Sequence, residues 1–154
     1  MSTSTLLASL GLLFVLMPLH ASADVAVILS KPEHFTDIGE GYGDIRRNTA
    51  ALEQHLKTQG AQCLRAGEKL ELQVFNVDLA GRDEWWYRPG HDLRVMRDIT
   101  WPKIDLGYAW RDAGGNVISA GREWVKDMNY LLHSATVRHD RDPLPYEKAM
   151  LHEW

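Results

Sequence analysis

The chain has 154 residues, of which 45% are hydrophobic and 25% are charged, a balance typical of one ordinary globular domain. Its 17 Lys and Arg against 21 Asp and Glu give a net charge of -4, so it lacks the basic excess that binding to a phosphate backbone requires. This composition excludes a disordered chain, a collagen-like fibre and a protein with several membrane spans.

The N-terminal segment predicts export. Residues 1–23 carry no charged side chain and are almost continuously apolar over 6–19, which is shorter than the ~20 residues that a spanning helix needs. Residues 21–23 read Ala-Ser-Ala, the small-x-small pattern of a signal peptidase site. We expect residues 1–23 to be a cleaved signal peptide and residues 24–154 to be a single periplasmic domain without a stable membrane anchor. An uncleaved anchor is the alternative.

Two short patterns precede a long predicted helix. Alternating side chains over 25–29 predict a first strand, and residues 30–33 have the spacing of a capping box that could open one helical turn. Asp44 is the expected N-cap of the helix. Its expected buried face consists of Ile45, Thr49, Leu52 and Leu56.

The helix is expected to end at Ala66-Gly67, and Gly60 is either an earlier cap or a soft point before Cys63, the one cysteine of the chain. Because Cys63 sits beside Leu64 at the end of an apolar face, we expect a buried and inert thiol. A reactive thiol and an intermolecular disulfide are the alternatives.

Strand patterns dominate the rest of the chain. We expect a strand over 70–79, an irregular loop over 80–92 and a further strand over 93–99. The clearest pair is a hairpin with strands at 103–111 and 117–126, joined by a Gly- and Asp-rich loop over 112–116.

Trp110 and Trp124 lie on the two hairpin strands, where we expect both in the core. Asp142 and Pro143 are the expected N-cap and first residue of a short terminal helix. Tyr146, Met150 and Trp154 mark one face of that helix. The order of elements predicts an α+β fold: a four- or five-stranded, mainly antiparallel sheet with one long helix and a short C-terminal helix.

The usual enzyme and metal motifs are absent from the sequence. There is no HExxH, GxSxG, Walker loop or CxxC pattern, and the scattered histidines have no metal-ligand spacing. Acidic residues at predicted strand ends form no recognised calcium loop. We therefore predict neither a metal site nor a cofactor.

The aromatic residues of the predicted 80–92 loop are the first candidate for recognition. Trp85, Trp86 and Arg88 cluster there, and Trp101 ends the next segment. Aromatic and arginine side chains together suit recognition of a protein or stacking on sugar rings. The alternative is a lid that folds back over the sheet, because large aromatic side chains are mostly buried.

A second candidate is a pair of carboxylates, Asp78 and Asp127, with Tyr130 nearby in sequence. Paired carboxylates with different pKa values can act as general acid and base. This reading would make the protein a small carboxylate-dependent, hydrolase-like enzyme.

A last observation is an ordered series of seven segments, at 35–39, 42–44, 77–81, 97–99, 102–106, 127–130 and 142–148. Together they resemble the secreted proteobacterial family named domain of unknown function 3016. The resemblance implies a small exported protein of Gram-negative bacteria and carries no established activity. We therefore predict a non-catalytic envelope binding or accessory module, whose partner is an envelope protein, a glycan or a small molecule and not nucleic acid.

Overall fold

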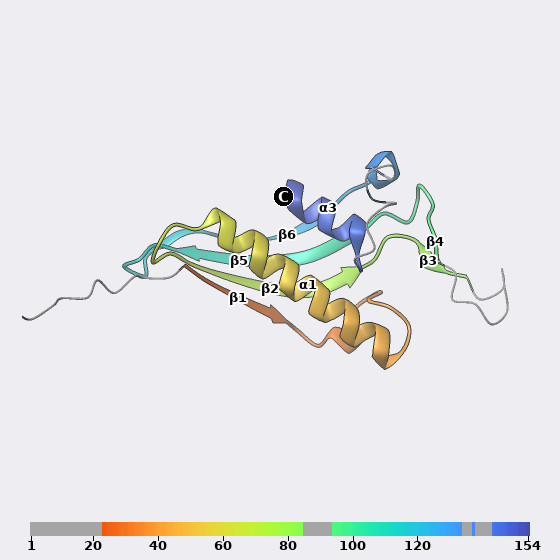
Figure 1. The fold of residues 1–154 in the computed structure, drawn as a ribbon, viewed down its shortest axis with the longest axis horizontal. Helices are drawn as coiled ribbons and strands as arrows, with labels where there is room; N and C mark the ends of the chain where they lie inside the picture. The colour runs from red at the N-terminus through yellow and green to blue at the C-terminus, as the bar shows by residue number, and fades with distance from the viewer. Residues whose placement is uncertain (1–22, 85–93, 134–136, 138–142) are drawn as a thin grey trace, which may run out of the picture.

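A computed structural model of the protein describes residues 23–84, 94–133, 137 and 143–154. The fold is α+β, with one long helix and a short C-terminal helix on a four-stranded sheet (Figure 1), so the predicted fold class is confirmed. The predicted signal peptide, but for Ala23, and the predicted binding residues Trp85, Trp86 and Arg88 lie outside the described residues.

The main sheet consists of β1 (Asp24–Leu29), β2 (Lys69–Asp78), β5 (Lys103–Arg111) and β6 (Val117–Lys126). A second, two-stranded ladder consists of β3 (Arg82–Asp83) and β4 (Arg94–Val95). The helices are α1 (Gly41–Cys63) and α3 (Pro145–Glu153), with the short 3₁₀ turns η1 (Pro32–His34) and η2 (Tyr130–His133).

The main sheet has the strand order β1-β2-β5-β6. β1 and β2 are parallel, so the chain must cross between them, and α1 makes this crossing. β2, β5 and β6 are antiparallel neighbours, and β5 and β6 form the predicted hairpin. The predicted strand over 93–99 is reduced to the two residues of β4, and β3 forms inside the predicted irregular loop.

A bulge in β2 decides which side chains at its end enter the core. Register with β5 shifts between Val74 and Asn76, so the alternation of side chains is interrupted there. Val77 consequently lies in the core opposite Ile104, and Asp78 is placed opposite Lys103. Without the bulge, the alternation that begins at Leu72 would place Asp78 on the core side.

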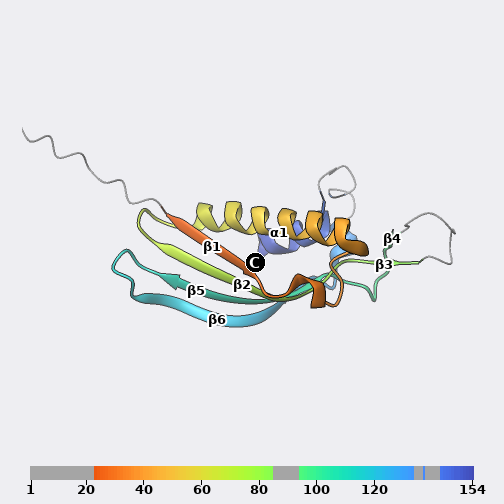
Figure 2. The same ribbon diagram turned by 90° about the horizontal axis from the view of Figure 1, so that it is seen from below.

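Both helices lie on the same face of the sheet (Figures 1 and 2), and the core forms between them and the strands. Its most buried side chains include Leu52, Leu56, Leu72, Val74, Ile104 and Leu106. Trp124 is the register partner of Asp105 and therefore belongs to the opposite face, where it is 49% exposed. The expectation that Trp124 is a core residue was therefore wrong.

The bounds and buried face of α1 differ from the expectation. The helix begins at Gly41 after an extended Glu40, three residues before the expected N-cap Asp44. Its buried positions repeat every four residues, at Asn48, Leu52, Leu56 and Gly60. Cys63 lies off this row and is exposed, so the expectation of a buried thiol was wrong.

The C-terminal helix also begins later than expected. α3 starts at Pro145, after Leu144 in a left-handed conformation with φ 63°, whereas the sequence suggested Asp142 and Pro143. Its buried residues are Glu147, Met150 and Leu151, so the expected row is correct only at Met150. Among the described residues, neither helix is long and apolar enough to cross a membrane.

Candidate functional site

Charged side chains gather at the end of the sheet where β2 ends and the chain turns into the small β3–β4 ladder. The segment before α1 runs alongside this end of β2, because Asp37 N–H donates to the Val77 carbonyl over 2.9 Å and Asp37 bridges Asp78 in parallel register. Asp37 and Asp78 are thereby held next to each other. We call Asp37, Asp78, Arg82, Asp83, Arg94 and Lys103 the carboxylate–arginine cluster.

Asp78 is the most buried member of the cluster, with a side chain 3% exposed. Its Oδ2 lies 2.9 Å from Lys103 Nζ, and its Oδ1 lies 2.8 Å from Arg82 Nη1 as an ion pair without hydrogen-bond geometry. Lys103 reaches Asp78 because the bulge in β2 makes the two residues direct register partners. Each carboxylate oxygen therefore faces a cation, which compensates the cost of burying the charge.

Arg94 ties the β3–β4 ladder to the sheet. Its guanidinium pairs with Asp37 from the segment before α1 and, over 3.0 Å, with Asp83 of β3. Its Nε also donates to the Ala80 carbonyl over 2.6 Å. One arginine thus bridges three stretches of chain with the planar fork of donors that only arginine offers.

Two further buried carboxylates flank the cluster. Glu84, directly after β3, pairs with Arg97 over 2.7 Å. Glu147 of α3 accepts a hydrogen bond of 2.7 Å from the Ala80 N–H. Burial raises the pKa of Glu147, while the hydrogen bond from Ala80 and the charge of Arg94 act in the opposite direction.

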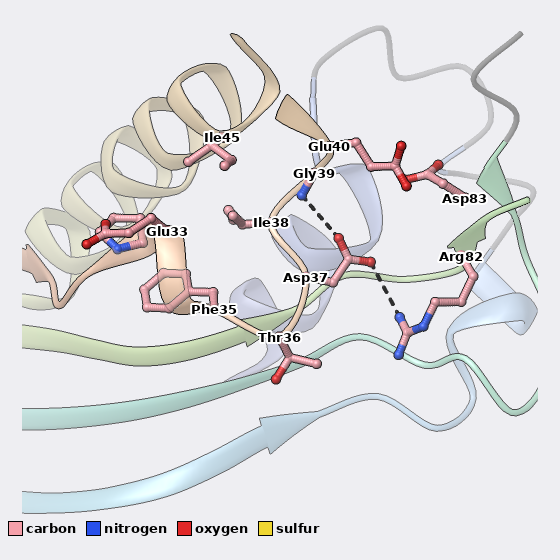
Figure 3. Close-up of a pocket in the computed structure, with 11 residues that line it drawn as sticks. Glu33, Phe35, Thr36, Asp37, Ile38, Gly39, Glu40, Ile45, Arg82 and Asp83 are labelled. Carbon is pink, nitrogen blue, oxygen red and sulfur yellow. Dashed lines mark hydrogen bonds and ion pairs between the residues drawn. The ribbon is translucent and has the colours of Figure 1, made fainter. Parts of the chain in front are cut away.

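A cavity of about 320 Å³ opens beside the cluster (Figure 3). Phe35 and Ile45 form an apolar side, and Asp37 and Arg82 form a charged side. Asp37 uses one oxygen to accept from the Gly39 N–H and turns the other toward Arg82. Within the described parts of the chain, no group of three or more His, Cys, Asp or Glu is placed to hold a metal ion.

The structure places the predicted acid–base residues near the same end of the sheet. Asp127 follows Lys126, the register partner of Lys103, and its Oδ1 accepts a 2.8 Å hydrogen bond from the Asn129 N–H. Tyr130 is fully buried, and its hydroxyl donates to the Arg97 carbonyl over 2.7 Å.

Of the predicted aromatic binding residues, only Trp101 lies in the described chain, where it is half-buried. Trp85, Trp86 and Arg88 lie outside the described residues, in the segment between Glu84 and Arg94. Glu84 and Arg94 are each held by an ion pair.

Sequence reasoning missed the partners of the cluster, notably Asp37, Arg94 and Glu147. Arg94 and Asp37 are 57 residues apart, and Glu147 and Ala80 are 67 apart, so no local spacing connects them. The available signal was the presence of arginines on both sides of the aromatic segment, which does not identify their partners.

The comparison with protein families finds a match over residues 23–154 to the model described as protein of unknown function (DUF3016), and the chain belongs to this family. The comparisons with curated proteins and with solved structures find no match.

Proposed function

We propose that this DUF3016 protein is an exported, non-catalytic module of the bacterial envelope that binds glycan through the aromatic segment between β3 and β4. The observation that carries the proposal is the anchoring of both ends of that segment. Asp83 pairs in register with Arg94, and the Arg94 guanidinium connects this ladder to Asp37. Recognition loops are commonly built in this way, on a rigid scaffold that fixes their ends.

The chemistry of the segment supports a glycan. Trp85 and Trp86 offer flat apolar faces on which sugar rings can stack, and Arg88 offers several N–H donors for hydroxyl or carboxylate oxygens. Half-buried Trp101 lies on the chain that returns from β4, so it is available to extend the same aromatic surface.

The contacts of Asp78 favour a binding role over catalysis. A general acid needs a proton to donate and a general base needs an accessible lone pair. Both oxygens of Asp78 instead face cations, and its side chain is 3% exposed. Tyr130 is similarly committed to the Arg97 carbonyl.

Cosedimentation with purified peptidoglycan sacculi tests the binding. We expect Trp85→Ala combined with Trp86→Ala to weaken retention by about tenfold, because each aromatic contact contributes about 0.5–1.5 kcal/mol. The matched control is Trp124→Ala, which removes a 49% exposed tryptophan from the sheet face opposite α1 and α3. Its retention should equal that of the unchanged protein.

The melting temperature separates binding from packing. It should change by no more than a few degrees in the double variant, since the rings are proposed to face the ligand. A large loss of stability would show that the rings form a lid over the core, and unchanged retention would exclude them from glycan binding. Export is tested by mass spectrometry of the protein from its native host, where a chain starting at Asp24 is expected and a full-length cytosolic chain would contradict the proposal.

A further inference from the structure

A second cavity lies at the other end of the sheet, between the last turns of α1, the end of α3, the start of β2, the end of β5 and Glu123 of β6. It is a groove of about 370 Å³, within the range of small-molecule sites. Leu56, Leu70, Leu72 and Leu151 contribute its aliphatic lining. We call it the aromatic groove, because Tyr108, Trp110 and Trp154 line it as well.

The three aromatic rings are held in fixed orientations. The indole N–H of Trp110 donates to Glu68 Oε2 over 3.2 Å, and that of Trp154 donates to Glu123 Oε1 over 2.9 Å. The rings of Tyr108 and Trp154 meet edge to face, with centroids 5.9 Å apart. These contacts orient the rings before any ligand arrives, so less entropy is lost on binding.

The charges around the aromatic groove favour a cation. Among the described residues that line it, Glu123 has the only carboxylate side chain and there is no Lys or Arg. The one titratable base in the lining is His152, whose Nδ1 lies 3.2 Å from Gln59 Oε1. In the described chain, Glu123 is in no ion pair with a basic side chain. Aromatic faces attract organic cations through their quadrupole, and a neighbouring carboxylate adds to this attraction. A fatty acid anion would instead meet the Glu123 carboxylate, with no Lys or Arg in the described lining to compensate the repulsion.

We propose that the aromatic groove binds a single-chain organic cation, with its ammonium group against the aromatic rings and Glu123 and its apolar chain over the leucines. This site is separate from the aromatic segment between β3 and β4, because its strand residues lie at the opposite ends of β2 and β5 from Asp78 and Lys103. The groove therefore gives the protein a second ligand class, independent of glycan.

Titration calorimetry with two probes of equal chain length tests the charge preference. Decyltrimethylammonium and decanoate are compared below their micelle concentrations, and the cation should bind about tenfold more tightly. Tetramethylammonium, which lacks the chain, should bind more weakly than decyltrimethylammonium. Equal affinity for cation and anion, or no binding of the cation, would overturn the proposal.

Two variants locate the binding. Trp154→Leu keeps an apolar side chain but removes the ring, and Glu123→Gln keeps the shape but removes the charge. Each should weaken cation binding by about fivefold. Both residues are exposed, so the fold should survive either change. Glu71→Gln is the matched control, since Glu71 is exposed and does not line the aromatic groove. Unchanged affinity in both groove variants would refute the assignment.

Cys63 provides an independent reporter. It is exposed, lines the aromatic groove and is the one cysteine of the chain, so thiol alkylation reports this position alone. Bound decyltrimethylammonium should slow alkylation of Cys63, and an unchanged rate under saturation would place the cation elsewhere. Cosedimentation with phosphatidylcholine vesicles tests whether the aromatic groove binds a membrane surface instead of a soluble cation. Binding to vesicles without binding of the monomeric cation would also contradict the proposal.

Discussion

Arg94→Ala is the sharpest test of how the β3–β4 ladder is anchored. The substitution removes the cation from Asp37 and Asp83 and a donor from the Ala80 carbonyl. Breaking a fully buried ion pair costs about 3–5 kcal/mol, and breaking an exposed pair costs about 0–1 kcal/mol. The Arg94 side chain is 22% exposed, and the carboxylates are 16% and 21% exposed. This intermediate burial leads us to expect a loss of about 2–3 kcal/mol in the free energy of unfolding.

Urea unfolding followed by circular dichroism measures this loss. Arg47→Ala is the matched control, because Arg47 pairs with Asp44 over 2.9 Å on the exposed side of α1. Its loss should stay below about 1 kcal/mol. Arg94→Lys keeps the charge but loses the fork of donors, so its stability should lie between the two. If Arg94→Ala cost no more than Arg47→Ala, the cluster would be a set of weak surface pairs and our account of the anchoring would fail.

Three further changes have calculable directions. In a urea titration, Gly81→Ala should lower the free energy of unfolding by about 2 kcal/mol or more, since φ is +77° and the added Cβ would lie 2.8 Å from the Val95 carbonyl oxygen. Gly115→Ala is the control: φ is +86° but the added Cβ meets open space, so the loss should be only about 1 kcal/mol. Burial lowers the pKa of His55, so the unfolded chain binds a proton there at a higher pH than the folded protein does, and the protein should lose stability as pH falls below 6.5. When unfolding is compared at pH 7.5 and 5.5, His55→Gln should lose less stability than the unchanged protein. Burial raises the pKa of Glu147, so the contribution of its side chain to the free energy of unfolding becomes less favourable as pH rises from about 4.5. Glu147→Gln should therefore gain stability relative to the unchanged protein as pH rises. A constant difference in stability across pH would contradict this.

The parts of the fold that the sequence predicts well are those encoded locally. The β5–β6 hairpin follows from alternating side chains and a five-residue loop in which Asp112 accepts from the N–H groups of Gly114 and Asn116. These contacts span four residues or fewer, so the pattern of residue types contains them.

The errors occur where the answer depends on what covers a surface. Trp124 is apolar and lies on a strand, but the described helices α1 and α3 both cover one face of the sheet, and Trp124 belongs to the other face. Cys63 is exposed because it lies three residues after Gly60, whereas the buried row of α1 repeats every four residues. Periodicity identifies a face and cannot state which tertiary element, if any, packs against it.

The candidate site was only partly predictable for the same reason. Asp78 could be selected as a strand-end carboxylate, but its two cations come from β3 and from β5, whose register with β2 depends on a bulge. Arg82 and Lys103 are ordinary basic residues in the sequence. Their role arises only after β2 and β5 have paired.

The irregular backbone at the end of β2 accounts for several of the charged side chains that gather there. The chain leaves the regular sheet after Asp78, so the next backbone groups lose their strand partners while they remain buried. Side chains replace those partners: Ala80 N–H donates to Glu147, and the carbonyls of Ala80 and Gly81 accept from Arg94 and Arg82. A buried backbone group without a partner would cost about 1–3 kcal/mol. Glu147, Arg94 and Arg82 thus complete the hydrogen bonding of the main chain here, so their position alone is no argument for catalysis at this end of the sheet.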